Sequence, residues 1–362
     1  MKSTRKELQF DEQEIQLLFG CETAEDESRD RLRKYYYKTH VYNQVITDLP
    51  LRVLVGHKGI GKSALFQVAM SEEEEQNKLV VLIKPDDVID IGKKSTSFME
   101  MIREWKAGII EIVARKVLIN LDIPEKNWSK NIKNLGGKLT DYLLQILDDM
   151  SEINMQFAKK EIIHQYQKSK SIYIYIDDLD RGWEGKKEDI NRLSALLNAV
   201  RDLSTEKNRL FFRIALRSDV YFLVRTSDES TDKIEGSVIW HTWSNNDIFL
   251  LWIKRVESFF GNEIDEHTLR HKKQKELAYL LNRIMENRFL GVGHWRNAPM
   301  YRVFMSLIRQ RPRDLVKLCT LAARNTYERR GNLISTLDVK KSFEEYSQGR
   351  MRAMLESGVW AG

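Results

Sequence analysis

The chain has 362 residues, of which 42% are hydrophobic, and its 59 basic residues nearly match its 53 acidic ones, leaving a net charge of +6. This length and apolar fraction allow a large α/β domain with a sizeable core and a smaller companion domain. No run approaches the roughly eighteen consecutive apolar residues of a membrane-spanning helix, so we expect no membrane partner. The mild charge permits contact with nucleic acid without arguing for it.

The first residues and the cysteines indicate the compartment. The opening MKSTRKELQFDEQEIQ is charged throughout and lacks the apolar core of a signal peptide. Cys21 and Cys319 lie far apart and match no metal or redox spacing. We therefore expect a cytoplasmic protein with reduced thiols.

Residues 1–48 predict a helical lead-in. Apolar residues gather in 14–19, Gly20 interrupts them, and a charged stretch with scattered aromatic residues follows. The aromatic run 35–37 either packs against the domain that follows or forms a recognition surface. The sequence leaves both alternatives open.

The segment LRVLVGHKGIGKSAL, residues 51–65, is the central motif of the chain. An apolar, β-branched run ends at Gly56, four residues follow, and G-K-S at 61–63 opens a stretch of helix formers. This is the G-x-x-x-x-G-K-[ST] phosphate-binding loop in its strand–loop–helix setting. Gly56, Gly59 and Gly61 are expected to take positive φ, so that successive N–H groups form an anion-binding nest at a helix N-terminus. The chain is therefore predicted to bind a nucleoside triphosphate.

The side chains of this loop have separate chemical tasks. Lys62 supplies a positive charge within reach of the β- and γ-phosphates, and the Ser63 hydroxyl is a ligand for Mg²⁺. A guanine-specifying N-K-x-D is missing, because Asn77-Lys78 is followed by Leu-Val, so we expect ATP. The predicted nucleotide contacts in the loop are Gly56, His57, Lys58, Gly59, Ile60, Gly61, Lys62, Ser63 and Ala64.

The chain after the loop alternates between strand and helix signals. A short helix is expected from 63 to 70, with the acidic run 72–75 as a solvated helix end or turn. Residues 79–84, LVVLIK, predict a buried strand of a parallel sheet. The next strand begins only at Ser171, too far away for one crossover connection. Apolar residues at helical spacing therefore predict a helical insertion at about 97–168.

A second chemical motif is SIYIYIDDLDRGW, residues 171–183. Its apolar strand ends in Asp177 and Asp178, which matches the Walker B site of P-loop NTPases at the carboxyl edge of the sheet. Asp177 is expected to hold Mg²⁺, directly or through a water, and Asp178 to activate or position the attacking water. For this pair taken alone, the alternative is an ordinary acidic turn.

The following strand, residues 210–216, ends in Arg217. A polar group at this position is suited to sensing the γ-phosphate, and we predict this role for Arg217. The alternative is an ion pair with Asp219 or Asp178.

The remaining segments complete three predicted regions. Residues 189–203 form an amphipathic helix, 227–236 a polar loop and 238–242 a final short strand. The predicted domains are a helical lead-in (1–48), an ATPase core (49–245) and a helical C-terminal lid (246–362).

The late segment RQRPRDLVKL carries two further candidates. Pro312 suits the first turn of a helix, and Arg311 and Arg313 flank that helix start. There they are placed to reach a nucleotide bound across the domain interface or phosphates of nucleic acid. The alternative is pairing with Asp314 and other carboxylates.

Four blocks together resemble a known group. The loop GHKGIGKSAL, the motif IDDLDR, the strand end ALRSD and the late RPRDLVKL are similar to KAP-related and STAND-like P-loop ATPases of the additional-strand division. The resemblance implies a five-stranded parallel core with a helical lid, ATP hydrolysis coupled to conformational change, and a role in bacterial conflict or signalling, including phage defence. It also implies that Asp177 is the Mg²⁺ aspartate, Asp178 the activating acid and Arg217 the first sensor, with Arg311 or Arg313 as the carboxyl-terminal sensor. Family members often carry membrane inserts, repeats or a fused effector. None is visible in this sequence, which suggests a separate partner protein.

The fold class we expect is α/β: a three-layer P-loop NTPase with a parallel sheet, a long helical insertion and a helical C-terminal domain. The leading functional hypothesis is an Mg²⁺-dependent ATPase that acts as a switch or motor subunit, forms homo-oligomers and works with a separate effector or sensor protein. The first alternative is a nucleotide-gated module with little turnover that binds nucleic acid through basic stretches at 126–138 and 324–330. A weaker alternative is a small-molecule kinase.

Overall fold

The computed structural model describes residues 8–93, 97–120, 163–164, 170–206, 209–227 and 229–356. Contacts between residues divide the chain into two units. We call them the sheet unit (Val41–His57 and Ala69–His241) and the helical unit (Met1–His40, Lys58–Val68 and Thr242–Gly362). The predicted domain boundaries follow continuous sequence, whereas each of these units is assembled from separate stretches of chain.

The sheet unit is built around five strands that are all parallel. They are β1 (Leu51–Gly56), β2 (Leu79–Ile83), β3 (Ile172–Ile176), β4 (Leu210–Arg217) and β5 (Val238–Trp240), in the order β2-β3-β4-β1-β5. Strand β4 therefore separates β1, which leads into the phosphate loop, from β3, which leads into the acidic pair. This arrangement confirms the predicted α/β fold class, that of a P-loop ATPase.

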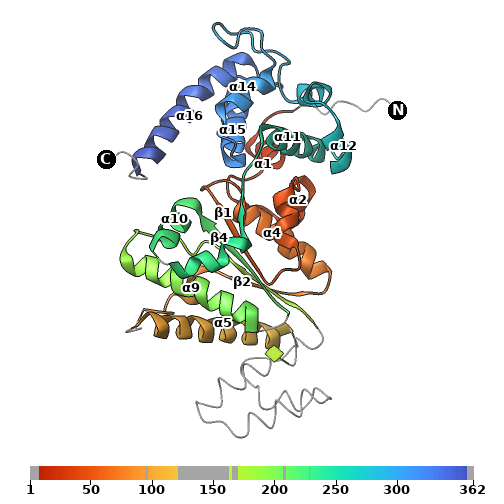
Figure 1. Cartoon of the computed structure of the whole chain (residues 1–362). Coiled ribbons are helices and arrows are strands. Elements are labelled where there is room, and N and C mark those ends of the chain that lie inside the picture. The colour runs from red at the N-terminus through yellow and green to blue at the C-terminus, as the bar shows by residue number, and fades with distance from the viewer. Residues whose placement is uncertain are drawn as a thin grey trace. The chain divides into compact units, whose positions relative to one another are not determined.

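One face of the sheet is apolar. Alternate strand residues such as Val53, Ile174 and Ile214 point into a core shared with the neighbouring helices, because successive side chains of a strand alternate between faces. Figure 1 shows α5 (Phe98–Asn120) and α9 (Lys187–Glu206) side by side along this core. Helix α10 (Ser218–Ser227) adds Val220 and Val224 to it.

The opposite face carries a buried polar network. The Tyr175 hydroxyl donates to Glu73 of α4 (Lys62–Glu75) at 2.8 Å, and the Tyr173 hydroxyl donates to Asp48 at 2.8 Å. Arg213 is fully buried and donates to the carbonyls of Thr47 (2.7 Å), Leu49 (2.9 Å) and Phe212 (2.9 Å). Burial raises the pKa of Glu73 to about 7, although the Tyr175 hydrogen bond and the Arg213 charge act in the opposite direction.

Two local predictions need correction. Helix α4 ends at Glu75, so the acidic run forms a helix end as predicted, but Glu73 within it is only 3% exposed and accepts a hydrogen bond from Tyr175 instead of facing solvent. The stretch predicted as a polar loop contains the 3₁₀ helix η5 (Glu229–Ser237). Elsewhere in the sheet unit the structure contains α3 (His40–Ile46), which begins at the last residue of the helical unit, and the short 3₁₀ turn η2 (Pro85–Val88). The predicted insertion is described over α5 and at 163–164 only, and 121–162 lie outside the described residues.

The helical unit has its own core. Its described helices are α1 (Glu12–Phe19), η1 (Ala24–Asp26), α2 (Arg29–Tyr35), α11 (Asn245–Phe259), α12 (Glu266–His271), α13 (Gln274–Leu277), η6 (Ala278–Arg283), α14 (Met300–Leu307), α15 (Pro312–Glu328) and α16 (Thr336–Glu356). Pro312 occupies the first turn of α15, as predicted. The aromatic run Tyr35–Tyr37 is at most 5% exposed, which supports packing rather than a recognition surface. None of the described helices is long and apolar enough to cross a membrane.

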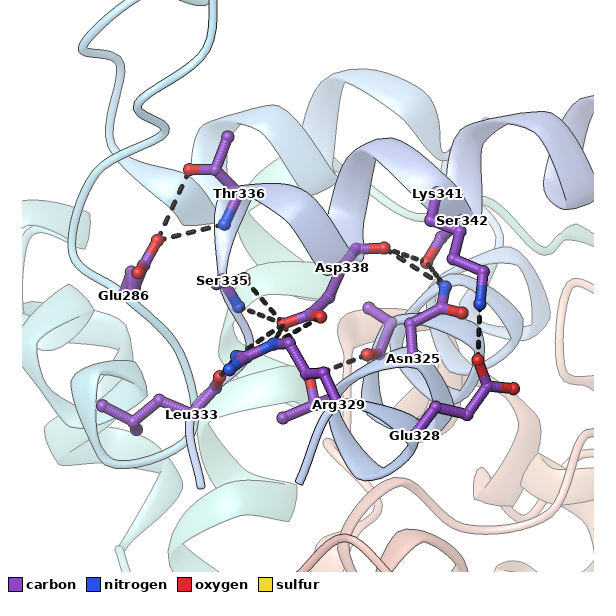
Figure 2. Close-up of polar contacts among 12 residues, drawn as sticks. Glu286, Asn325, Glu328, Arg329, Leu333, Ser335, Thr336, Asp338, Lys341 and Ser342 are labelled. Carbon is purple, nitrogen blue, oxygen red and sulfur yellow. Dashed lines mark hydrogen bonds and ion pairs between the residues drawn. The ribbon is translucent and has the colours of Figure 1, made fainter. Parts of the chain in front are cut away.

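The start of α16 is fixed by hydrogen bonds around Asp338 (Figure 2). Its carboxylate accepts from Arg329 at 2.7 Å, from the Ser335 backbone at 2.7 Å and from Thr326 at 3.0 Å. Burial by itself raises the pKa of Asp338, but these donors outweigh it and hold the pKa below its usual value. Glu286 accepts a hydrogen bond from the Thr336 backbone N–H at 3.0 Å. A residue that precedes α15 in the sequence is thus in contact with the start of α16, which follows it.

Candidate functional site

The loop between β1 and α4 has the backbone of a phosphate cradle. Gly59 and Gly61 take φ values of 78° and 100°, a region that side chains with a Cβ rarely adopt. Gly56 is a correction to the prediction, because it keeps a negative φ: it is the last residue of β1 and still pairs with Arg217 of β4. The turn therefore depends on two glycines rather than three.

Two hydrogen bonds fix the loop from outside, one in each unit. In the helical unit, the Trp243 indole donates to the Ile60 carbonyl at 2.7 Å, and both residues are almost fully buried. In the sheet unit, His57 Nδ1 lies 3.0 Å from the Ser218 hydroxyl. Sequence reasoning missed both partners: Trp243 belongs to no recognisable motif, and Ser218 lies in the block ALRSD but is given no role there.

The other predicted loop residues differ in exposure, and the last three of them belong to helix α4. His57 and Lys58 are exposed, Ile60 is 5% exposed, and Lys62, Ser63 and Ala64 form the first turn of α4. The Ile60 side chain packs into the core of the helical unit, which leaves only its backbone for the predicted nucleotide contact.

Arg313 lies against the loop within the helical unit. A Cβ built on Gly59 would come within 3.4 Å of Cβ and Cδ of Arg313, and the Arg313 guanidinium donates to the Glu22 carbonyl at 3.1 Å. The alternative pairing with Asp314 is made by Arg309 instead, at 3.4 Å. Arg311 is the N-cap residue of α15 and is partly buried. Arg313, one of the two predicted arginines, therefore lies at the phosphate loop.

The acidic pair follows β3 directly. Asp177 is 8% exposed, and its backbone N–H bonds the Ile83 carbonyl of β2 at 3.1 Å. Asp178 has a φ of 61°, unusual for a residue other than glycine, and ion-pairs with Arg181 at 2.9 Å. Its backbone N–H donates to the Asp177 carboxylate at 3.0 Å. The two carboxylates are thus held in different environments, one buried and one partly exposed.

Arg217 forms the ion pair that the sequence analysis offered as the alternative. Its Nε donates to Asp219 at 3.2 Å and lies 3.4 Å from Asp180. The pairing with Asp178 is not the one formed, because Asp178 pairs with Arg181 instead. Gly56, Asp177 and Arg217 nevertheless stand at the ends of β1, β3 and β4. Since these strands are parallel, all three residues occupy the carboxyl edge of one sheet.

The residues present fit a nucleotide with Mg²⁺. The Ser63 hydroxyl and the Asp177 carboxylate are oxygen donors, which Mg²⁺ prefers. The positive φ values at Gly59 and Gly61, just ahead of α4, are of the kind found in anion-binding nests of backbone N–H groups. Oxygen ligands and amide donors of this kind match the charges of a triphosphate and its metal ion.

Comparison with known proteins gives one family match and several distant relatives. Residues 254–355 match the model of the FunZ-associated C-terminal helical domain. A putative transposon gamma-delta 80.3 kDa protein of Escherichia coli K12 is 22% identical over 92% of this chain and 50% of its own length, so the chain spans about half of that relative.

Solved structures with similarity include Cdc6p of Pyrobaculum aerophilum, at 14% identity and a TM-score of 0.43 over 88% of this chain and 71% of that chain. A Walker-type ATPase of Pyrococcus abyssi is 13% identical, with a TM-score of 0.42 over 89% of this chain and 75% of that chain. At these identities and TM-scores the similarity is distant. The sheet order and the phosphate loop define the P-loop ATPase fold by themselves.

Proposed function

We propose that the protein binds ATP with Mg²⁺ and hydrolyses it. The loop amides and Lys62 hold the phosphates, and Ser63 and Asp177 hold the metal ion, which supplies charge neutralisation for phosphoryl transfer. Asp178 orients the attacking water and accepts its proton.

The observation that carries this proposal is the backbone of the phosphate loop. Gly59 and Gly61 adopt the positive φ values of an anion-binding nest, and the loop follows directly on β1, whose sheet carries Asp177 at its carboxyl edge. The positive φ of Asp178 adds support, because strained backbone is often retained at functional positions.

Arg217 and Arg313 are proposed as sensors of the γ-phosphate. Arg217 is held by Asp219 and Asp180, so contact with a phosphate requires it to exchange these carboxylates for the ligand. Arg313 already lies against Gly59. Arg217 would lose its ion pairs and Arg313 its bond to the Glu22 carbonyl on contact with the nucleotide, so the ATP-bound and ATP-free states would differ in their polar contacts, which is the basis of a switch. Arg311 remains a secondary candidate.

We further propose that this switch serves a multi-protein system in the bacterial cytoplasm. The resemblance to KAP-related and STAND-like ATPases supports a homo-oligomeric subunit with a separate effector or sensor partner, including a role in phage defence. The name of the distant relative, a transposon protein, is compatible with conflict between mobile elements and their hosts.

The direct test measures ATP binding and phosphate release separately. Lys62→Ala is expected to weaken ATP binding at least 10-fold and abolish turnover. Asp178→Asn is expected to retain binding while turnover falls about 10²–10⁴-fold, because the water loses its general base. Lys275→Ala is the matched control, since it removes an exposed lysine of the helical unit.

Three outcomes would contradict parts of the proposal. Wild-type turnover in Asp178→Asn would remove the base assignment, and unchanged turnover in excess EDTA would remove the metal. Phosphate that appears on a small-molecule acceptor rather than in water would indicate a kinase.

A further inference from the structure

Residues 288–299 form a hairpin-shaped loop in the helical unit, which we call the hairpin. Arg288 and Pro299 form an antiparallel bridge, and Phe289 exchanges hydrogen bonds of 2.9 Å with Asn297 and Ala298. In Figure 1 the hairpin is the blue loop that extends beyond α14. The matched FunZ-associated domain includes this segment.

The base of the hairpin is fixed to the domain. Phe289 is 2% exposed and packs against the rings of Trp295 and Phe343. The Leu290 backbone donates to the Thr336 hydroxyl at 2.8 Å, and Figure 2 shows Thr336 held in turn by Glu286. The hairpin therefore presents its outer residues from a rigid support.

The outer surface of the hairpin is apolar at its centre. Leu290 is 73% exposed, Val292 is 83% exposed, and Leu337 at the neighbouring start of α16 is 71% exposed. Single exposed apolar residues are ordinary, but three on adjoining segments indicate a contact surface.

Positively charged side chains lie close in sequence to these apolar residues. Arg288, Arg296 and Lys340 are exposed, and residues 287–299 contain no acidic residue. Within the described residues, the guanidinium of Arg296 has neither a hydrogen-bond nor an ion-pair partner, and Lys340 only approaches the Phe289 ring, at 5.8 Å. Two acidic residues close in sequence, Asp338 and Glu286, are engaged in the cluster at the start of α16.

We propose that the hairpin and the first turn of α16 bind duplex DNA. Arg296 and Lys340 contact backbone phosphates, while Leu290 and Val292 enter the minor groove as an apolar wedge. Cations neutralise phosphates without regard to sequence, and small apolar side chains beside cations are a recurring means of entering the minor groove. DNA binding by this surface does not depend on ATP hydrolysis.

An anionic membrane is the competing occupant of an apolar surface with a cationic rim. The side chains of Leu290, Val292 and Leu337 together contain fewer carbons than one myristoyl chain, which by itself gives only marginal membrane binding. Binding to DNA needs less apolar surface than binding to a membrane, because the cations supply most of the affinity for DNA. The charge of the hairpin therefore favours DNA.

The basic stretch at 324–330 is less suited to this task than the hairpin. Arg324 forms a bidentate pair with Glu12, at 2.8 and 3.0 Å, and Arg329 is held by Asp338. Two of the three cations of this stretch are thus occupied within the helical unit, and Arg330 is the third. The stretch at 126–138 lies outside the described residues.

The test measures binding of the full chain to a labelled 30-base-pair duplex by fluorescence anisotropy at several KCl concentrations, without nucleotide. Arg296→Gln/Lys340→Gln is expected to weaken binding at least 10-fold and to reduce the slope of log K against log salt by about 1.8, because each neutralised phosphate adds about 0.9 to that slope. Leu290→Ser/Val292→Ser is expected to weaken binding several-fold with an unchanged slope. Lys272→Gln/Lys275→Gln removes the same charge from another exposed site and is expected to bind like the wild type.

Three results would overturn the proposal. These are failure of the wild type to bind at 50 mM KCl, equal losses in the hairpin and control variants, or retention by phosphatidylserine vesicles in place of DNA. Lys62→Ala is expected to bind the duplex normally, so failure of the ATPase proposal remains distinguishable from failure of this one. Retained ATP binding by the hairpin variants confirms their folding.

Discussion

The two faces of the parallel sheet are equally buried, but one is covered through apolar contacts and the other through polar ones. On the face covered by α5 and α9, Ile174 and Ile214 are fully buried among other apolar residues. On the face covered by α4, the adjacent residues Tyr175 and Arg213 are equally buried but polar. The apolar face is stabilised by close packing, whereas the polar face is stabilised by hydrogen bonds among buried groups, with Glu73 Oε1 and Arg213 Nε left without a partner among the described residues. The polar face also connects the helix that begins at the phosphate loop to the strand that ends at Asp177.

The largest expected difference in stability between substitutions on the two faces comes from Arg213→Met. This change keeps much of the volume but leaves the Thr47 and Leu49 carbonyls without their donor and removes a positive charge near Glu73. We expect a loss of about 3 kcal/mol in the free energy of unfolding. Ile214→Val on the apolar face is the control, with an expected loss of about 1 kcal/mol. Urea unfolding measures both, and equal losses would mean that the two faces do not differ in this way.

A second contrast is the response to pH. The pKa of Glu73 is raised to about 7 in the folded protein, so the folded state binds a proton that the unfolded state releases above its ordinary pKa of 4.5. Stability is therefore expected to fall as pH rises from about 4.5 to 7, by at most about 3 kcal/mol from this group. Glu73→Gln removes this contribution, so the stability difference between the variant and the wild type should change across this range. Parallel stability curves from pH 5 to 8 would contradict the prediction.

The smallest expected effect separates two hydroxyl groups on the polar face. Tyr175→Phe leaves the buried Glu73 carboxyl without its donor, and we expect a loss of about 1.5 kcal/mol. Tyr173→Phe removes the bond to Asp48 and is expected to cost about 0.5 kcal/mol, because water can replace the lost donor there. Thermal unfolding of both variants under the same conditions measures the two losses of stability. A larger loss for Tyr173→Phe than for Tyr175→Phe would contradict the prediction.

The elements that sequence reasoning predicted best are those whose signal is local. The loop at 56–63 and the pair Asp177–Asp178 are contiguous motifs, and the strands around them are short apolar runs. The burial of Glu73 was not predictable, because an acidic run on a helix is normally solvated and its partner Tyr175 is about a hundred residues away. The Trp243 anchor of the loop escaped prediction for the same reason.

For the three predicted arginines, the sequence offered alternative partners, and only the structure shows which contacts are formed. The ion pair of Arg217 with Asp219 is the alternative that the sequence analysis offered, whereas Asp178 pairs with Arg181. Arg311 and Arg313 are two residues apart in sequence, yet only the contact of Arg313 with Gly59 distinguishes their positions. Their roles toward a nucleotide stay predictions.

The strand order has a consequence for synthesis on the ribosome. β1 lies between β4 and β5, so its nearest pairing partner emerges about 160 residues after it. Until β4 has been synthesised, the β1 segment, which is rich in Leu and Val, lacks the strand with which it pairs. During this time its apolar side chains are open to aggregation and to binding by chaperones. The phosphate loop consequently gains its supporting sheet only after β4 has been made. Stalled chains that end before Leu210 should therefore lack ATP binding even though the whole loop motif has been translated.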